Sequence, residues 1–315
     1  MFDVVAIGES LIDFVTEGQN STGMALLSRN PGGAPANVLA MAAKLGNRTA
    51  FIGKVGRDAF GSFLKKTMED AGVDVSGLIV SPDYPTTLAF VQLDASGDRS
   101  FTFYRNQSAD IMLQKNEISE NLLHSCRILH FGSVSLTAEP SKSSTLYAVT
   151  QAKQAGAWIS YDPNYRPLLW NEENVARTTM LEAMDLADFV KVSDEELVFL
   201  PGETDLAAGA RILQKKGMRI LVVTRGALGA DFFAGDLHGH CDTIRVEVKD
   251  TTGAGDAFLG AFLHGLLTQS ADLDHLCEKT LTKLVCFANI AGALTATGKG
   301  AINSMPEVEE ICRFL

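Results

Sequence analysis

Uninterrupted apolar runs alternate along the chain with segments in which apolar residues recur at helical spacing. The runs at 4–7 and 220–224 are apolar on both faces, apart from one terminal threonine, which is typical of strands buried in a parallel sheet. The segment 59–71 instead places Phe60 and Leu64 on one helical face. Strands that alternate with helices predict a mostly parallel sheet covered by helices on both faces. The expected fold class is therefore α/β.

One region departs from this alternation of strands and helices. β-rich segments at 88–93 and 101–105 flank a turn at 94–98, and no helix separates them. That order predicts a hairpin, which we assign to a β lid formed from about 14–31 and 85–107. All 315 residues are expected to form a single domain. Lid strands with exposed edges favour a homodimer that forms lid to lid.

The nine residues 250–258 join a predicted strand to a predicted helix. Residues 244–249 alternate apolar and polar side chains, as a half-buried strand does, and apolar residues recur at helical spacing over 258–267. Gly253 and Gly255 therefore lie on a strand-to-helix turn, where free backbone N–H groups and the positive end of the helix dipole converge. Such a turn favours an anion.

Asp256 adds a carboxylate to this turn. It would repel a resting phosphate, but it could accept a proton from a hydroxyl that attacks one. The local sequence leaves an alternative open, in which the glycines make a tight turn and the acid complements the helix dipole. No Gly-Lys-Ser/Thr follows, and Gly253, Gly255 and Phe258 do not fit a dinucleotide fingerprint. Those two common phosphate-binding families are therefore disfavoured.

Several polar residues directly follow predicted strands. Ligands of open parallel sheets bind beyond the carboxyl ends of the strands, so we expect one shared site that contains Asp13, Arg166, Ser193, Glu196, Thr224 and Asp256. Gly32 and Gly33 enter an alanine-rich helix and let a ligand approach the backbone. Arg105 shares a strand face with Phe101 and Phe103, and its charge either reaches a ligand or extends to water.

Composition and charge narrow the class of partners. The chain has a net charge of -11 and no polybasic segment, which argues against nucleic acid and anionic membranes. No apolar run reaches the roughly 18 residues of a membrane span, and no secretion signal opens the chain, so we expect a cytoplasmic protein. The five cysteines are scattered without Cys-x-x-Cys spacing, which indicates neither a zinc site nor a disulfide framework.

Two separated motifs resemble the signatures of one family. Residues 32–38 and 53–61 are similar to the first signature of the ribokinase/PfkB carbohydrate kinases, and 250–258 to the second. The resemblance covers essentially the whole chain and implies a ribokinase-like three-layer α/β/α fold with a central, mostly parallel sheet and a small β-sheet lid. Gln107 stands where proline is expected, but fructokinases are the most similar members at 103–110, 131–135 and 161–166.

The resemblance implies ATP-dependent phosphorylation of a sugar hydroxyl, which for fructose is O6. Asp256 would act as general base, a role typically worth about 10²–10⁴-fold in rate, and the N–H groups of Gly253, Ala254 and Gly255 would form an anion hole. Family positions that hold the sugar correspond to Asp13, Gly32, Gly33, Asn37, Arg105 and Arg166. Positions on the nucleotide side correspond to Asn164, Ser193, Glu196, Thr224, Gly226 and Asn289.

Two metal ions are also implied by the resemblance. The family's Asn-x-x-Glu motif of the Mg²⁺ network occurs here as Ser193 to Glu196, so serine replaces asparagine while the acid is kept. Asp250 and Thr252 match a loop that usually binds K⁺, although the motif also occurs in members without dependence on that ion.

Two rival functions remain open. A 2-keto-3-deoxygluconate kinase shares the fold, and Arg105 and Arg166 could clamp its carboxylate. The similarity of 105–110 to fructokinases favours fructose. The second rival is a sugar- or nucleotide-sensing protein that kept the fold and lost the chemistry, and the intact Asp256 with its flanking glycines argues against it.

Overall fold

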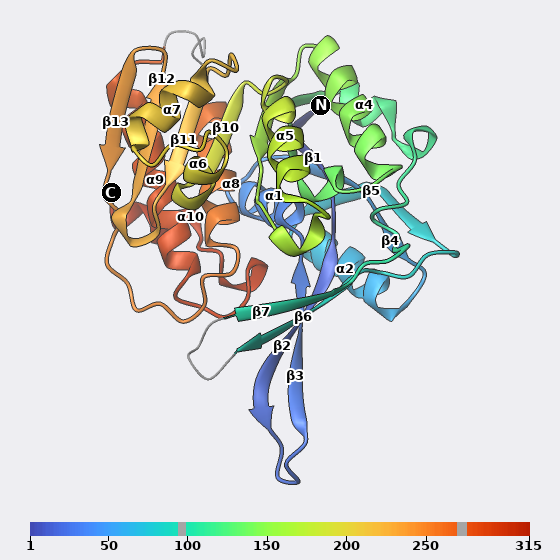
Figure 1. The fold of residues 1–315 in the computed structure, drawn as a ribbon. Helices are drawn as coiled ribbons and strands as arrows, with labels where there is room; N and C mark the ends of the chain where they lie inside the picture. The colour runs from blue at the N-terminus through green and yellow to red at the C-terminus, as the bar shows by residue number, and fades with distance from the viewer. Residues whose placement is uncertain (94–98, 270–275) are drawn as a thin grey trace.

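The computed structural model describes residues 1–93, 99–269 and 276–315. A large α/β body carries a small lid that projects from it (Figure 1). In the described chain, the larger sheet has nine strands in the order β13-β12-β11-β10-β9-β8-β1-β4-β5, and the lid sheet has four in the order β3-β2-β6-β7. The predicted fold class, α/β with a mostly parallel central sheet and a β lid, is confirmed.

The strands of the larger sheet are β1 (Phe2–Ile7), β4 (Thr49–Gly56), β5 (Val73–Ser81), β8 (Cys126–Gly132), β9 (Trp158–Asp162), β10 (Phe189–Ser193), β11 (Ile220–Thr224), β12 (Ala230–Ala234) and β13 (Leu237–Cys241). The lid strands are β2 (Leu11–Gln19), β3 (Ala25–Gly32), β6 (Leu88–Leu93) and β7 (Arg99–Tyr104). The described helices are α1 (Ala34–Lys44), α2 (Ala59–Asp70), α3 (Glu120–His124), α4 (Ser141–Gln154), α5 (Glu173–Met184), α6 (Asp194–Phe199), α7 (Leu206–Gln214), α8 (Ala254–Thr268), α9 (Glu278–Thr295) and α10 (Val308–Cys312). None of them is long and apolar enough to cross a membrane.

The larger sheet is buried between two layers of helices. Every neighbouring pair from β5 to β11 is parallel, whereas β12 pairs antiparallel with both β11 and β13. Side chains alternate between the faces of β1: Val4 and Ala6 join a core cluster with α1, α8 and α9, whereas Val5 and Ile7 join one with α4, α5 and α7. This double burial explains why the strands are continuous apolar runs.

The lid is built from two chain segments that flank the first helices of the body. β2 pairs antiparallel with β3 and parallel with β6, and β6 pairs antiparallel with β7. The β2–β3 hairpin extends away from the body (Figure 1). The lid strands span 11–32 and 88–104, close to the expected 14–31 and 85–107. The predicted turn at 94–98 lies outside the described residues.

The prediction of a strand at 244–249 is wrong. The edge strand β13 ends at Cys241, and the chain then leaves the sheet for the end of α9. There the backbone N–H of Lys249 donates to the carbonyl of Ala296 at 2.9 Å. Ile244 still packs against the core, so the alternating pattern reflects one-sided burial without a partner strand.

A disulfide joins Cys241 to Cys286, with their Cα atoms 5.5 Å apart, and ties the end of β13 to α9. The cysteine spacing did not predict this disulfide, and that prediction is corrected here. The two cysteines are 45 positions apart, and they meet only because α9 packs against the edge of the sheet. Cys126, Cys277 and Cys312 are free thiols.

Candidate active site

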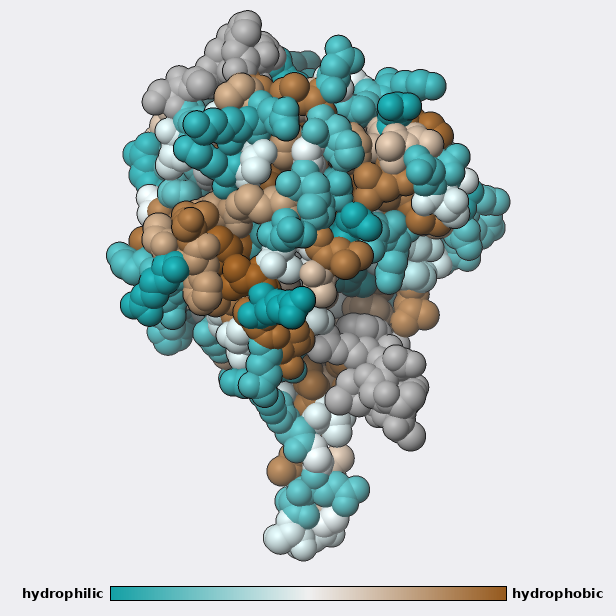
Figure 2. All heavy atoms as spheres, turned by 90° about the vertical axis from the view of Figure 1, so that its left-hand side faces the viewer, coloured by the Kyte–Doolittle hydropathy of each residue, from teal (hydrophilic) through white to brown (hydrophobic). Residues whose placement is uncertain are grey.

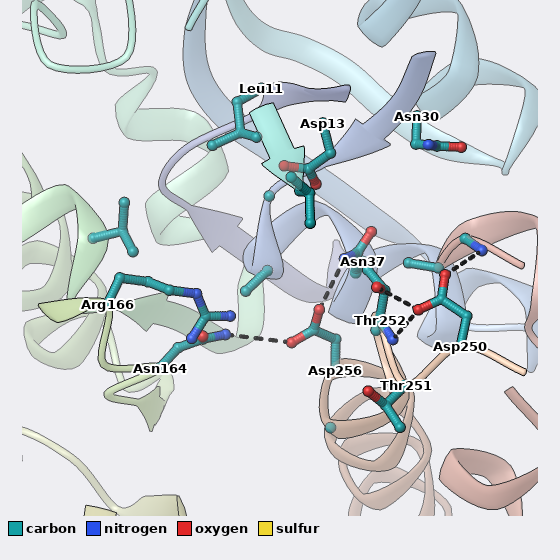
Figure 3. Close-up of a pocket in the computed structure, with 18 of the residues that line it drawn as sticks. Leu11, Asp13, Asn30, Asn37, Asn164, Arg166, Asp250, Thr251, Thr252 and Asp256 are labelled. Carbon is teal, nitrogen blue, oxygen red and sulfur yellow. Dashed lines mark hydrogen bonds between the residues drawn. The ribbon is translucent and has the colours of Figure 1, made fainter. Parts of the chain in front are cut away.

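A cavity of about 790 Å³ opens between the lid and the carboxyl ends of the parallel strands. Its walls come from β2, the start of α1, the loop after β9, the start of α6 and the start of α8 (Figure 3). The cavity brings together the six residues that were expected to share one site: Asp13, Arg166, Ser193, Glu196, Thr224 and Asp256.

Asp256 lies in the first turn of α8 and is 8% exposed. The Asn37 Nδ2 donates to its Oδ2 at 2.8 Å, and the Asn164 Nδ2 lies 3.5 Å from its Oδ1 (Figure 3). Burial raises the pKa of Asp256, and the hydrogen bond from Asn37 opposes that rise. The carboxylate is therefore oriented by two amides, and within the described residues it forms no ion pair with a bonded cation.

Two glycines shape the turn that precedes Asp256. Gly253, the N-cap of α8, has a left-handed backbone with φ of 77°, and a Cβ there would collide with Ala301. Gly253 and Gly255 both line the cavity. Ala254 does not line it, and its N–H donates back to the Thr251 carbonyl at 3.2 Å. Of the three N–H groups expected in the anion hole, that of Ala254 is therefore already engaged, and those of Gly253 and Gly255 stay candidates.

Asp13 enters the cavity from the lid. It lies on β2, and burial raises its pKa to about 6 while the charge of Arg166 counteracts the rise. Gly32 on the paired strand β3 does not line the cavity, but a Cβ there would collide with the Asp13 carboxylate. Gly33 lines the cavity with φ of 116°, and a side chain there would strike the backbone of Glu9. Glycine is thus required at both positions by close neighbours, which are the Asp13 carboxylate at Gly32 and the backbone of Glu9 at Gly33.

The two arginines expected at the site have different positions. Arg166 follows β9 and lines the cavity. Arg105 is 8% exposed and outside the lining, because its guanidinium donates to Asp110 Oδ2 at 2.7 Å, Thr137 Oγ1 at 2.6 Å and the Val134 carbonyl at 3.0 Å. Arg105 is therefore not at the cavity, contrary to its expected position, and is a buried support for the cavity wall.

Ser193 and Glu196 form a capping box at the start of α6. Ser193 Oγ accepts from the Glu196 N–H at 3.1 Å, while Glu196 Oε2 accepts from the Ser193 N–H at 2.8 Å. Glu196 Oε1 accepts from the Tyr165 N–H at 2.7 Å. Burial, followed by repulsion from Asp162, raises the pKa of Glu196. Each carboxylate oxygen retains a lone pair that can accept from a metal-bound water.

The other residues expected on the nucleotide side are divided. Thr224 lines the cavity at the end of β11, whereas Gly226 and Asn289 do not. Gly226, two positions after Thr224, has a left-handed backbone with φ of 54°. Asn289 is buried on α9, and its Nδ2 donates to the Cys241 carbonyl at 2.8 Å. Its amide thus holds the end of β13 against α9, next to the disulfide.

The loop before α8 is organised by Asp250. Its Oδ1 accepts from the N–H and Oγ1 of Thr252 at 2.9 and 2.7 Å, and its Oδ2 accepts from the Gly300 N–H at 3.0 Å. Oxygen donors of this kind suit a hard cation such as K⁺. In the described part of the chain, no group of three or more His, Cys, Asp or Glu side chains could hold a metal ion by itself.

Three lining or adjacent residues were missed by the sequence analysis. Lys191 lies on β10 and pairs with Asp162 at the end of β9, with Nζ to Oδ2 at 2.7 Å. Glu9 follows β1, and its Oε1 accepts from the Ala34 N–H at 3.2 Å. The sequence did offer a signal for the Lys191–Asp162 pair, which is the lysine inside the apolar run 189–192. A charge in a buried strand requires a partner.

This constellation of a buried acid, an amide-rich helix start and a β lid defines a carbohydrate kinase. Residues 1–308 match the pfkB family carbohydrate kinases, and the chain belongs to that family of ATP-dependent sugar kinases.

More particularly, the relatives that it resembles over nearly its full length include fructokinases. The chain is 43% identical to Fructokinase-1 of Zea mays over 99% of this chain and 97% of that protein. It is 42% identical to the probable fructokinase-2 of Arabidopsis thaliana over 99% of this chain and 95% of that protein.

Solved structures agree with this relationship. Fructokinase from Xylella fastidiosa with bound ATP has a TM-score of 0.91 and 33% identity, covering 99% of this chain and 98% of its own. A double mutant of fructokinase from Vibrio cholerae O395, with fructose, ADP and potassium ion bound, has a TM-score of 0.89 and 36% identity, covering 100% and 98%.

Proposed function

We propose that this chain is a fructokinase that transfers the γ-phosphoryl group of ATP to O6 of D-fructose. The full-length similarity to fructokinases supports the choice of sugar. The observation that carries the proposed chemistry is the buried Asp256 carboxylate, which is held by Asn37 and Asn164 at the start of α8 and lies across the cavity from Asp13 (Figure 3).

In the proposed reaction, Asp256 takes the proton of the sugar O6 hydroxyl as O6 forms a bond to the γ-phosphorus. The bond from that phosphorus to the β–γ bridging oxygen breaks, and its electron pair leaves on ADP. Backbone N–H groups around Gly253 and Gly255 stabilise charge on the phosphoryl oxygens, and the loss of one such donor costs roughly 10²–10³ in rate. Alignment of the two substrates supplies much of the remaining acceleration.

Asp13 and Asn37 are the proposed ligands of the other sugar hydroxyls. Asn37 Oδ1 is buried and has no hydrogen-bond partner in the described chain, so a sugar hydroxyl would supply the missing donor. The Asp13 carboxylate can accept from two adjacent hydroxyls. Arg166 would contact the sugar from the facing wall. Gly32 would support this site by leaving room for the Asp13 carboxylate, and Gly33 by letting the chain pass close to the backbone of Glu9.

The nucleotide is proposed to bind beside β10 and β11. Asn164, Ser193, Glu196 and Thr224 would face its phosphates. Gly226 and Asn289 stay predictions for the more distant part of the nucleotide, since neither lines this cavity. Mg²⁺ fits this corner, because Glu196 offers carboxylate oxygens and the phosphates complete the shell of an ion that usually keeps several waters. The ion would neutralise phosphate charge. K⁺ would bind in the Asp250–Thr252 loop.

The main rival for the substrate is 2-keto-3-deoxygluconate. A two-arginine clamp would be the natural recognition element for its carboxylate, but only Arg166 of the expected pair lines the cavity, since Arg105 is engaged by Asp110. A single arginine can serve a neutral sugar by donating to its hydroxyls. This arrangement favours fructose.

A sugar panel tests the proposed function. Steady-state rates are measured with ATP and Mg²⁺ on D-fructose, other hexoses and 2-keto-3-deoxygluconate, each with KCl or with NaCl. We expect the highest kcat/KM on fructose, a product phosphorylated at O6 by NMR, and a higher rate in K⁺. Preference for the keto acid, or phosphorylation at O1, would refute the assignment.

A homodimer through the lid is proposed as the assembly. β3 is an edge strand in the described lid sheet, and Met24, Leu26 and Leu27 near its start are 63%, 46% and 47% exposed. The space-filling view shows the lid as a narrow extension of the body (Figure 2). A free strand edge of this kind invites pairing with a second copy. Light scattering should give a dimer, and Leu26→Lys with Leu27→Lys should give a monomer; a monomeric parent protein would refute the proposal.

A further inference from the structure

Lys191 is a buried cation at the floor of the cavity for which the proposed reaction has so far no role. It lies on β10, is 7% exposed, and donates from Nζ to Asp162 Oδ2 at 2.7 Å. Asp162, at the end of β9, is only 2% exposed. Burying an ion pair brings little or no net stability compared with apolar residues of similar volume. The pair therefore requires an explanation other than stability.

The Lys191 ammonium lies beside Gly255, one of the glycines of the proposed anion hole. A Cβ built on Gly255 would lie 3.2 Å from Lys191 Nζ and 3.7 Å from its Cε. Gly255 has no left-handed backbone that would by itself call for glycine. The absence of a side chain at this position thus lets the Lys191 ammonium lie directly against the start of α8, one residue before Asp256.

The surrounding charges keep Lys191 protonated. Burial alone would lower the pKa of the ammonium, but attraction to Asp162, Glu196 and Asp256 outweighs burial and raises the pKa. An ammonium has three N–H donors, and the described residues take up one of them, through Asp162. The remaining donors and the charge lie where phosphoryl oxygens would collect at the amide-rich helix start.

We propose that Lys191 is a further catalytic residue, whose ammonium contacts the oxygens of the transferring phosphoryl group, and that Asp162 is the positioning residue that aims it. The proposal rests on the kinase reaction above and leaves its bond changes unaltered: O6 gains the phosphoryl group, ADP takes the electron pair, and Asp256 takes the proton. Lys191 keeps all its protons. It acts on the charge that spreads over the phosphoryl oxygens as the two bonds exchange.

Lys191→Met tests the proposal, and Lys54→Met is its matched control. Lys54 is also a buried strand lysine, 5% exposed, with Nζ 2.6 Å from Glu117 Oε1, but it does not line the cavity. We expect Lys191→Met to lower kcat by roughly 10²–10³ with little change in the Kd of fructose. Lys54→Met should reduce thermal stability and leave kcat near that of the parent protein. Equal kcat for the two variants would overturn the proposal.

Nucleotide binding separates a catalytic role from a structural one. Lys191→Met should bind ADP alone like the parent, but should bind ADP with aluminium fluoride, a mimic of the transferring phosphoryl group, more weakly by roughly tenfold or more. Lys191→Arg, which keeps the cation, should recover part of that loss. Asp162→Asn should lower kcat by a smaller factor with unchanged ADP affinity. Equal losses for ADP and for the mimic, or no loss for either, would overturn the proposal.

The same measurements distinguish this proposal from the choice of sugar. If the parent protein fails to phosphorylate fructose, the fructose assignment fails, and Lys191 is judged by the aluminium fluoride complex alone. If fructose is phosphorylated and Lys191→Met retains both turnover and affinity for the mimic, only the role of Lys191 fails.

Discussion

At the scale of single residues, Asp256 is set apart by burial and by two amides that orient it. Replacing it with asparagine keeps the volume and an oxygen acceptor for Asn37, but removes the ability to take a proton. We expect Asp256→Asn to lower kcat by about 10²–10⁴, with the Kd of fructose by calorimetry little changed. Turnover within a few-fold of the parent would contradict the assignment of Asp256 as the base.

Glu9 makes the free energy of unfolding depend on pH, because its carboxyl group titrates differently in the folded and the unfolded protein. Burial raises its pKa from 4.5 to about 7, and its Oε2 has no hydrogen-bond partner in the described chain. Between these two pKa values the folded protein holds a proton that the unfolded chain has released. The free energy of unfolding therefore falls as pH rises through this window, by about 3 kcal/mol from this group.

Glu9→Gln should remove that pH dependence. Glutamine keeps an oxygen to accept from the Ala34 N–H and does not titrate. Urea unfolding at pH 5 and pH 7.5 should therefore show the variant gaining stability relative to the parent as pH rises. Because all other groups are shared, the difference between the two proteins isolates Glu9. Parallel pH dependences would contradict the raised pKa.

At the scale of elements, the packing of α8 depends on a glycine that faces α1. A Cβ on Gly260 would lie 2.6 Å from the Val38 carbonyl oxygen and 2.7 Å from Met41 Cβ. Backbone cannot move aside easily, so Gly260→Ala should destabilise the protein by about 1–3 kcal/mol, as overpacking of cores does. That loss exceeds the gain of up to about 1 kcal/mol expected when alanine replaces glycine in a helix.

Gly265 in the same helix provides the matched control. The three atoms nearest to a Cβ there all belong to the Leu284 side chain, and the one in close contact is its outer methyl Cδ2, at 2.6 Å. Gly265→Ala should therefore be near neutral in thermal unfolding, whereas Gly260→Ala should unfold at a lower temperature. If both variants lose the same stability, helix-to-helix contact is not what selects glycine at position 260.

The elements also show which parts of the fold can be predicted from the sequence. Buried strands, the turn before α8 and the lid strands carry local patterns, and these were predicted correctly. The predicted strand at 244–249 was wrong, because one-sided burial of Ile244 produces the same alternation as a half-buried strand. Pairing with a neighbour, which distinguishes the two, is a tertiary property.

The candidate site divides in the same way. Residues at strand ends could be predicted to meet, because parallel strands bring their carboxyl ends to one edge of the sheet. The direction taken by Arg105, the pairing of Lys191 with Asp162 and the bond between Cys241 and Cys286 could not be predicted. Each depends on which side chains from distant elements come within contact distance.

At the scale of the whole molecule, the proposed sugar site is shared between lid and body. Asp13 lies on the lid strand β2, whereas Asn37 and Asp256 belong to α1 and α8 of the body. Beyond the sugar site, Lys299 Nζ donates to Glu17 Oε2 at 2.7 Å and joins the body to the outer part of β2. This exposed ion pair holds the lid only weakly.

A ligand that bonds to both parts would therefore fix the lid more firmly than the protein does alone. Fructose should slow amide hydrogen exchange across β2 and β3, because its hydroxyls would link Asp13 to Asn37, and protected amides report lower local opening. ADP alone should protect the start of α8 and leave the lid strands unchanged. Asp13→Asn should reduce the protection of the lid by fructose while the response to ADP persists. Protection by fructose that is confined to the body would show that the lid takes no part in holding the sugar.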